Sequence, residues 1–234
     1  MSEFTFTIDN VPVKARKGQT ILEAADAAGI YIPRLCYHKD LLPGGACRLC
    51  TVLVNGRPQS ACTHPAADGM TVQNETPELA DWRRSVLEMI FVEGNHYCMF
   101  CEKSGNCELQ ALGYRLGMLS PRHPFLFPLR NIDMSHPDVA IDRNRCILCG
   151  RCVRGSKLLD KKSVFGMVRR GAHTRLAVNS GGKLKDTDLS LADRAVNLCP
   201  VGCILRKREG YKIPIGRRLY DAAPIGSEVE KRRS

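Results

Sequence analysis

The sequence predicts an α+β fold that is divided into several small modules. Polar and apolar residues alternate near the N-terminus, as in β-strands, whereas apolar residues recur at helical spacing after residue 76. The 12 cysteines of this 234-residue chain fall into four groups separated by long cysteine-free stretches. We therefore expect modules in series, with boundaries at 1–75, 76–120, 121–137, 138–210 and 211–234.

The first module is predicted to pair two strands and then to form a helix and a hairpin. Residues 4–8 alternate in polarity, and residues 11–15 are expected to form the returning strand. The Thr-Ile-Leu-Glu sequence at 20–23 is a capping box, which predicts a helix that closes near Gly29. An Asn-Gly pair at 55–56 between two strand-like runs is a strong hairpin signal.

The later modules combine short helices with a further hairpin. Thr76 followed by Pro77 predicts a helix start, and a second helix is expected over 108–116. The first of these helices has an expected apolar stripe of Leu79, Trp82, Val86, Ile90 and Phe91. Four prolines make 121–137 a Pro-rich connector, followed by a hairpin over 164–178. Residues 211–234 are expected to form a basic C-terminal tail.

The composition is that of an ordinary globular protein. It is 44% hydrophobic and 25% charged, and no apolar run approaches the roughly 18 residues of a membrane span. The N-terminus has no basic start followed by an apolar stretch, so we expect no secretory signal and a cytoplasmic location. In that reducing compartment, cysteines are expected to bind metals rather than to form disulfides.

The positive charge fits more than one kind of partner. A net charge of +11 and a pI of about 9.2 suit either acidic partner subunits or nucleic acid. Only 6% of the residues are aromatic and the basic residues are dispersed, which disfavours nucleic acid. The sequence has no Gly-x-Gly-x-x-Gly dinucleotide fingerprint and no convincing Ser-His-Asp set, so we expect no catalytic residue and no substrate site on this chain.

One cysteine group has the spacing of a ferredoxin cluster. The C-x2-C-x2-C run consists of Cys146, Cys149 and Cys152. Such a loop holds three corners of a cubane cluster, and a distant Cys-Pro pair supplies the fourth, as Cys199 and Pro200 would. The second triplet of two-cluster ferredoxins is missing here. We therefore predict one [4Fe–4S] cluster, with a zinc knot as the alternative.

The first cysteine group has a spacing similar to that of plant-type ferredoxins. Its C-x10-C-x2-C-x11-C pattern consists of Cys36, Cys47, Cys50 and Cys62. Plant-type [2Fe–2S] proteins use a C-x4-C-x2-C loop and a distant cysteine, so the first gap is longer here. The adjacent Gly44 and Gly45 let the backbone approach an inorganic sulfide closely. We predict a [2Fe–2S] cluster, although zinc binds the same thiolates.

The remaining group has three cysteines and one nearby histidine. The four candidate ligands are His96, Cys98, Cys101 and Cys107. A neutral imidazole can fill the fourth corner of a [4Fe–4S] cluster and tends to raise its potential, although a lone histidine is more often a cap or a surface residue. Cys203 is left over from all three sets. It is either a small buried core residue or a redox-active spare beside the third cluster.

The order of these ligand sets resembles that of known redox subunits. The second set is followed by Glu108-Leu109-Gln110 and the third ends in Cys199-Pro200-Val201-Gly202, similar to the N-terminal part of the large iron–sulfur subunit of complex I and to the accessory region of [FeFe] hydrogenases. Those relatives usually have three residues between the histidine and the first cysteine, whereas only Tyr97 intervenes here. This gap and the chain's end soon after the third set look most like the small diaphorase (gamma) subunits of NAD-reducing [NiFe] hydrogenases.

The resemblance implies both a fold and an electron-relay function. The fold would be an N-terminal β-grasp [2Fe–2S] ferredoxin-like domain, a helical [4Fe–4S] module with one histidine and three cysteine ligands, and a C-terminal ferredoxin-like [4Fe–4S] module. The implied partners in a hetero-oligomer are a flavin/NAD-binding diaphorase subunit and the hydrogenase small and large subunits. By analogy, the [2Fe–2S] cluster faces the flavin subunit and the His-ligated cluster faces the hydrogenase.

Two alternatives to this function stay open. The first is the equivalent subunit of an NAD-dependent formate dehydrogenase or of a complex I-like NADH dehydrogenase. The second, from a different class, is a zinc-stabilised binding module.

Overall fold

The N-terminal domain is a five-stranded mixed sheet with one helix packed on it. The computed structural model describes residues 3–231. The elements of this domain are β1 (Glu3–Ile8), β2 (Val11–Arg16), α1 (Ile21–Ala27), β3 (Thr51–Val54), β4 (Arg57–Ser60) and β5 (Thr71–Gln73). The strand order is β2-β1-β5-β3-β4, with β1 and β5 parallel and the other pairs antiparallel. This is the β-grasp arrangement that the resemblance implied.

The local signals of the sequence explain how this domain forms. Thr20 and Glu23 form the complete capping box at the start of α1, as predicted. Asn55 and Gly56 have φ values of 48° and 77°, which suit the turn between β3 and β4. Alternate side chains such as Phe6 and Ile8 are almost fully buried in the same apolar core as α1. The predicted strands, helix and hairpin are therefore confirmed.

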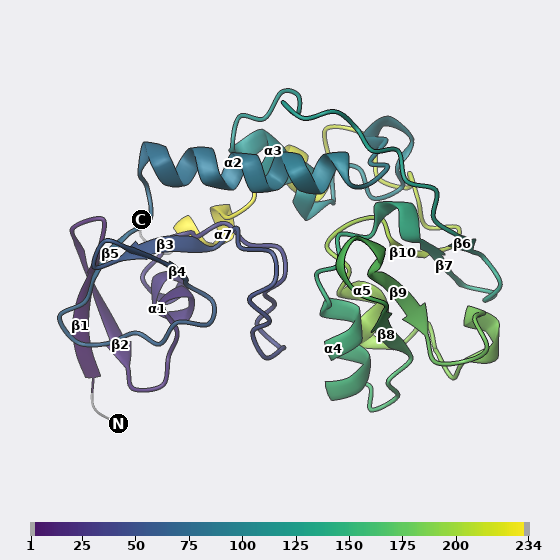
Figure 1. Ribbon diagram of the computed structural model, residues 1–234, viewed down its shortest axis with the longest axis horizontal. Helices are drawn as coiled ribbons and strands as arrows, with labels where there is room; N and C mark the ends of the chain where they lie inside the picture. Colours follow the sequence, from purple (N-terminus) through teal and green to yellow (C-terminus); the bar gives the residue numbers. More distant parts are fainter. Residues whose placement is uncertain (1–2, 232–234) are drawn as a thin grey trace.

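The second part consists of two helices and an irregular turn. Its elements are α2 (Pro77–Val92), the 3-10 turn η1 (Cys98–Phe100) and α3 (Glu108–Arg115). In Figure 1, α2 runs above the molecule from the N-terminal domain on the left toward the C-terminal module on the right. Thr76 caps α2 and Pro77 is its first residue, as the sequence predicts.

The predicted apolar stripe of α2 is only partly correct. Leu79 is fully buried, but Trp82 is 37% exposed, and the buried face of α2 instead includes Arg83 and Leu87. The Arg83 guanidinium donates to the backbone oxygens of Asn74 and Thr51, at 2.9 and 2.8 Å. These hydrogen bonds join α2 to the N-terminal domain, which is why a basic residue lies on the inner face.

The third part contains two small antiparallel sheets and two helices. The elements are β6 (Ile132–Asp133), β7 (Val139–Asp142), η2 (Arg143–Arg145), α4 (Arg151–Leu158), β8 (Phe165–Val168), η3 (Gly171–His173), β9 (Arg175–Val178), η4 (Leu184–Asp186), α5 (Arg194–Asn197) and β10 (Ile204–Arg206). One sheet has the order β10-β7-β6, and β8 pairs with β9. Because β6 pairs with β7, the end of the proline-rich segment belongs to this sheet and does not only connect modules.

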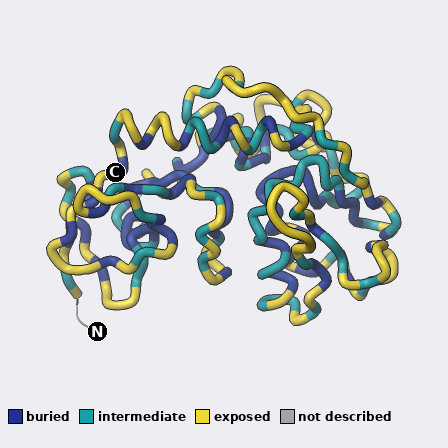
Figure 2. The backbone as a smooth tube through the Cα atoms, viewed as in Figure 1, coloured by how far each residue is buried: buried dark blue, intermediate teal, exposed yellow. Residues whose placement is uncertain are grey.

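The C-terminal segment returns to the N-terminal domain. It contains α6 (Leu219–Ala222) and α7 (Ser227–Glu230), and Ile225 and Val229 are buried. The Arg115 side chain donates to the Ile225 carbonyl at 2.8 Å, and a Cβ at Gly226 would lie 2.5 Å from the Tyr31 ring. Figure 1 accordingly places α7 next to the N-terminal domain, whose interior appears as dark, buried backbone in Figure 2. Part of the segment 211–231, including Ile225 and Val229, thus belongs to the folded core. Within residues 3–231, no helix is both long and apolar enough to span a bilayer.

Candidate metal centres

The β3–β4 hairpin brings together thiols of the first cysteine set. Cys50 precedes β3 and Cys62 follows β4, and the amide of Ala61 donates to the Cys50 carbonyl at 3.1 Å. The Cys50 and Cys62 thiols are in hydrogen-bond contact. Cys36 contacts both Cys62 and Cys47. Pairwise contacts therefore link the four thiols in the order Cys50, Cys62, Cys36 and Cys47, and we call them the first site.

Backbone amides also point at sulfur in the first site. The amides of Cys36 and Cys47 each donate to the other residue's Sγ at 3.4 Å. Hydrogen bonds from Cys47 and Cys62 lower the pKa of the Cys36 thiol to about 2, whereas hydrogen bonding to Cys36 and Cys50 raises the pKa of Cys62. Amide donors that favour thiolate are what an iron–sulfur centre needs, because only the thiolate ligates metal.

The second site is a cavity between α2 and α3. Its lining includes all four predicted ligands, which are His96, Cys98, Cys101 and Cys107. The Nε2 atom of His96 is buried and has no hydrogen-bond partner among the described residues. Burial and the charges of Arg145 and Arg130 lower the pKa of His96 to about 4. The ring is therefore neutral at pH 7, as a metal ligand must be.

A glycine without a side chain and an arginine shape this cavity. A Cβ at Gly94 would lie 2.5 Å from His96 Nε2, so only glycine leaves room for the ring. The Nη1 of Arg145 lies 3.6 Å from Cys101 Sγ, and amides at the start of α3 donate to Cys107. Burial nevertheless raises the pKa of the Cys107 thiol to about 12. A bound metal would supply the positive charge needed to deprotonate it.

The third site is built by the loop before α4 and by the segment around Cys199. Leu148 and Gly150 have φ values of 53° and 68°, which bend the loop around its cysteines. Amides of Leu148 and Arg151 donate to the thiols of Cys146 and Cys149. Burial raises the pKa of Cys152 well above its usual value, and the charges of the other three predicted ligands act on it in the same direction. Four thiols this close together fit a polynuclear metal centre.

Cys203 lies in this third site rather than apart from it. The Cys203 thiol is in hydrogen-bond contact with both Cys146 and Cys199, and the residue is only 1% exposed. Cys203 is thus buried, as expected of a core residue, and it also lies beside the third ligand set, as expected of a spare thiol there.

Within residues 3–231, no three His, Cys, Asp or Glu side chains converge closely enough to hold a single metal ion.

The contacts between the sites could not be read from sequence spacing. The Arg154 guanidinium donates to the carbonyls of Cys36 in the first site and Cys149 in the third, at 2.6 and 3.2 Å. The amide of Glu108 donates to the Pro200 carbonyl at 2.9 Å, which links the second site to the third. No motif marks Arg154 and Cys36 as partners, because they are 118 positions apart in the chain.

Comparison with known proteins assigns each part to a family. Residues 2–77 match the 2Fe-2S iron–sulfur cluster binding domain, and residues 83–122 match the NADH-ubiquinone oxidoreductase-G iron–sulfur binding region. Residues 136–205 match the ferredoxin-like domain of NADH-quinone oxidoreductase subunit 3. The matches support binding of both [2Fe–2S] and [4Fe–4S] clusters.

Relatives that align over the whole chain show to which of these redox protein families it belongs. The chain is 42% identical over 228 residues to the gamma subunit of the NAD-reducing hydrogenase HoxS of Cupriavidus necator, and the alignment covers 94% of both sequences. The chain belongs to the family of these gamma subunits. A crystal structure of an NAD+-reducing [NiFe]-hydrogenase in the H2-reduced state contains a chain with 47% identity and a TM-score of 0.94, with 98% of each chain covered. A member of this family is an iron–sulfur electron-transfer subunit of an oxidoreductase complex.

More distant relatives are larger proteins. The chain is 33% identical to the NADPH-Fe(3+) oxidoreductase subunit alpha of Geobacter sulfurreducens, and 34% identical to the mitochondrial NADH dehydrogenase [ubiquinone] iron–sulfur protein 1 of Solanum tuberosum. These alignments cover 87% and 88% of this chain, but only 24% and 28% of the relatives. The family's three-part iron–sulfur region thus also occurs as one part of longer redox subunits.

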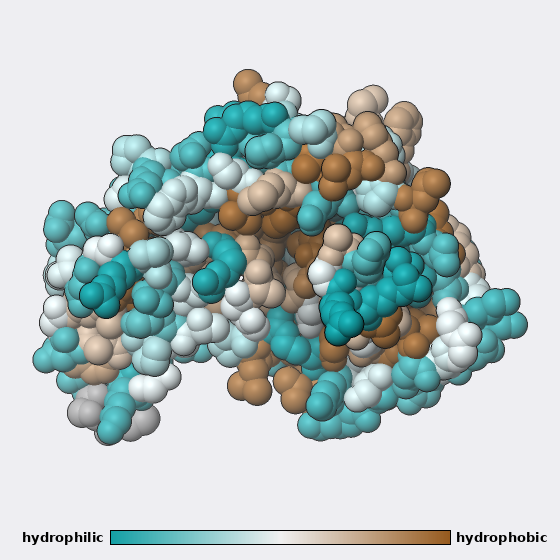
Figure 3. Space-filling model, viewed as in Figure 1, coloured by the Kyte–Doolittle hydropathy of each residue, from teal (hydrophilic) through white to brown (hydrophobic). Residues whose placement is uncertain are grey.

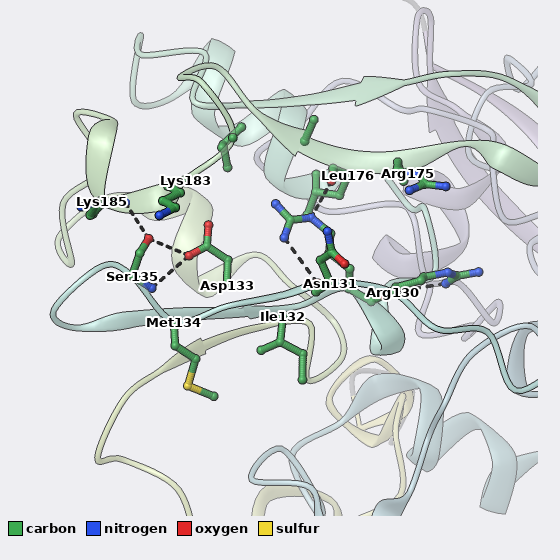
Figure 4. Close-up of a pocket in the computed structure, with 14 residues that line it drawn as sticks. Arg130, Asn131, Ile132, Asp133, Met134, Ser135, Arg175, Leu176, Lys183 and Lys185 are labelled. Atoms are coloured by element: carbon green, nitrogen blue, oxygen red, sulfur yellow. Dashed lines mark hydrogen bonds between the residues drawn. The ribbon is translucent and has the colours of Figure 1, made fainter.

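One open pocket of the third part is lined by no cysteine. Figure 4 shows this pocket, of about 830 Å³, between the β6 segment and β9. Arg143 donates to the Leu176 carbonyl, and Asp133 accepts hydrogen bonds from Ser135. These side chains hold the backbone of the third part in place.

Proposed function

We propose that this chain relays electrons through one [2Fe–2S] cluster and two [4Fe–4S] clusters. The proposed ligands are Cys36, Cys47, Cys50 and Cys62 for the [2Fe–2S] cluster, His96, Cys98, Cys101 and Cys107 for one [4Fe–4S] cluster, and Cys146, Cys149, Cys152 and Cys199 for the other. The observation that carries the proposal is the gathering of thiols from distant segments into three sites with amide donors aimed at sulfur. Each cluster, when bound, would take up and release one electron.

The residues around the clusters would set their potentials. Hydrogen bonds to sulfur and nearby positive charge favour the reduced form. The first site has the paired amides of Cys36 and Cys47, and the second has Arg145 beside Cys101. Imidazole in place of one thiolate makes the second site less negative. We therefore assign this chain to electron transfer, and substrate conversion to other subunits of the complex.

The proposed route runs from the first site through the third to the second. Arg154 joins backbone groups of the first and third sites, and the Glu108–Pro200 hydrogen bond joins the third and second. At one end, residues 42–48 of the ligand loop are exposed or half-buried. We place the flavin/NAD-binding diaphorase subunit there.

An apolar surface lies at the other end of the proposed route. Met99, Tyr211, Ile213 and Ile215 line one surface together with Cys98 and Cys101, and the exposed apolar residues of these two segments also include Tyr97 and Phe100. Met99 is 86% exposed although it sits between two predicted ligands. Figure 3 shows apolar side chains gathered at the upper right, over segments that follow α2. Exposed apolar patches mark protein contacts, and we propose the hydrogenase small and large subunits as these partners, in a cytoplasmic complex.

The test is the metal content and spectra of anaerobically purified protein. If the chain carries these clusters, the protein is brown and its visible absorbance bleaches with dithionite. Its iron content then equals that of one [2Fe–2S] and two [4Fe–4S] clusters. Colourless, zinc-loaded protein would contradict the proposal and favour a zinc-stabilised module. In the native complex, nickel with hydrogen-driven NAD reduction supports the hydrogenase assignment, whereas molybdenum or tungsten with formate oxidation would replace it with formate dehydrogenase.

A further inference from the structure

The guanidinium of Arg154 lies between the first and third sites. It is half-buried on α4 and donates to four backbone carbonyls, which belong to Cys36, Leu42, Cys149 and Gly150. Two of these carbonyls belong to proposed ligands of different clusters. A single planar group therefore holds the ligand loop of the N-terminal domain against the ligand loop of the third part.

The surroundings of Arg154 are adapted to this position. A Cβ at Gly44 would lie only 3.2 Å from the guanidinium carbon, so glycine leaves the space that the guanidinium fills. Among the ion pairs of residues 3–231, none includes Arg154, whereas the neighbouring Arg151 is paired with Glu108. A half-buried cation without a carboxylate partner needs negative charge from elsewhere. Two thiolate-bound clusters, one on either side, would supply that negative charge.

We propose that Arg154 is a positioning residue for electron transfer between the [2Fe–2S] cluster and the [4Fe–4S] cluster of the third site. This inference rests on the proposed function. One electron passes from the reduced cluster to the oxidised one, and no bond forms or breaks. Arg154 stays protonated throughout, because a guanidinium is not deprotonated in proteins. It acts in two ways, by fixing the separation of the two ligand loops and by adding a positive charge to both sites.

Two substitutions separate these effects. Arg154→Met removes the charge and the bridge, and is expected to lower the midpoint potentials of both clusters. A shift of about 59 mV would correspond to a tenfold change in the equilibrium constant of each one-electron couple. Arg154→Lys retains the charge but cannot hold both carbonyls, so the potentials stay near those of the wild type. The magnetic interaction between the two reduced clusters weakens in both variants.

The matched control is Arg194→Met. Arg194, at the start of α5, pairs with Asp40 of the same ligand loop. The experiment is an EPR-monitored redox titration of the whole complex, with spin relaxation of the [2Fe–2S] signal as the measure of separation. We expect Arg194→Met to leave the potentials and the relaxation unchanged.

Three outcomes would overturn the inference. One is an Arg154→Met variant that equals Arg194→Met in potentials and relaxation. Another is an equal fall in the midpoint potentials of all three clusters in Arg154→Met, which would indicate a general loosening of the fold. The third is wild-type spin relaxation of the [2Fe–2S] signal in Arg154→Lys. This variant alone tests the inference if Arg154→Met fails to take up iron. Wild-type protein without these clusters would instead refute the proposed function itself.

Discussion

The backbone amide of Glu108 donates a 2.9 Å hydrogen bond to the carbonyl of Pro200, 92 positions later in the chain. Glu108 follows Cys107 in the second site, and Pro200 follows Cys199 in the third. The Glu108 side chain also forms two hydrogen bonds with Arg151, at 2.6 and 2.7 Å. The short path Cys107–Glu108–Pro200–Cys199 thus contains one hydrogen bond and joins two proposed cluster ligands.

Replacing His96 by alanine is expected to remove or alter one [4Fe–4S] signal. The imidazole is the fourth candidate ligand of the second site, and its Nε2 has no other partner among the described residues. The [2Fe–2S] signal should persist, because the first site uses only cysteines. Iron analysis and EPR measure both effects. His123→Ala, an exposed histidine of the connector, is the control. Unchanged iron and spectra in His96→Ala would show that His96 is not a ligand.

Gly202→Ala should disturb the second site more than the third, although Gly202 lies three residues from Cys199. A Cβ at Gly202 would lie 2.7 Å from Cys101 Sγ, so the added methyl group displaces a ligand of the neighbouring site. The expected result is a shifted or broadened signal of the His-ligated cluster alone, measured by EPR. Gly166→Ala is the control, since its Cβ would meet open space. A selective change in the third cluster would be inconsistent with this packing.

Arg151→Met is expected to destabilise the joint between the second and third parts. The Arg151 side chain is 4% exposed and its charge is paired with Glu108. Breaking a buried pair from one side typically costs about 3–5 kcal/mol, because the remaining charge has no partner. The midpoint of thermal unfolding should fall by several degrees. Arg217→Met, at an exposed position, should leave it unchanged. If both variants unfold at the wild-type temperature, the pair contributes little.

Removal of iron should unfold the second and third parts before the N-terminal sheet. The N-terminal domain has an apolar core around Phe6, Ile8 and Val72. The core of the second and third parts includes the proposed ligands Cys107, Cys152 and Cys199, so we expect metal binding to supply much of the folding free energy there. Hydrogen exchange of chelator-treated protein should show lost protection over residues 96–107 and 146–152, and retained protection in β1. An iron-free chain with native-like cooperative unfolding would disprove this expectation.

The local elements and the grouping of the thiols can be predicted from the amino-acid sequence alone. Some features depend only on residues that are neighbours in the chain, so the sequence predicts them without knowledge of the fold. They are the caps at Thr20 and Thr76, the turn at Asn55–Gly56 and the C-x2-C runs. The buried face of α2 was predicted only in part, because Arg83 is buried through hydrogen bonds to carbonyls outside its own helix.

The contacts that join the three sites depend on the folding of the whole chain. Arg154 lies 118 positions from Cys36, and Cys203 contacts the third set only after the chain has folded. The course of the C-terminal segment back to Tyr31 likewise depends on packing and not on local pattern. Spacing along a chain specifies which residues share a loop, whereas contact between loops depends on the shape of the whole core.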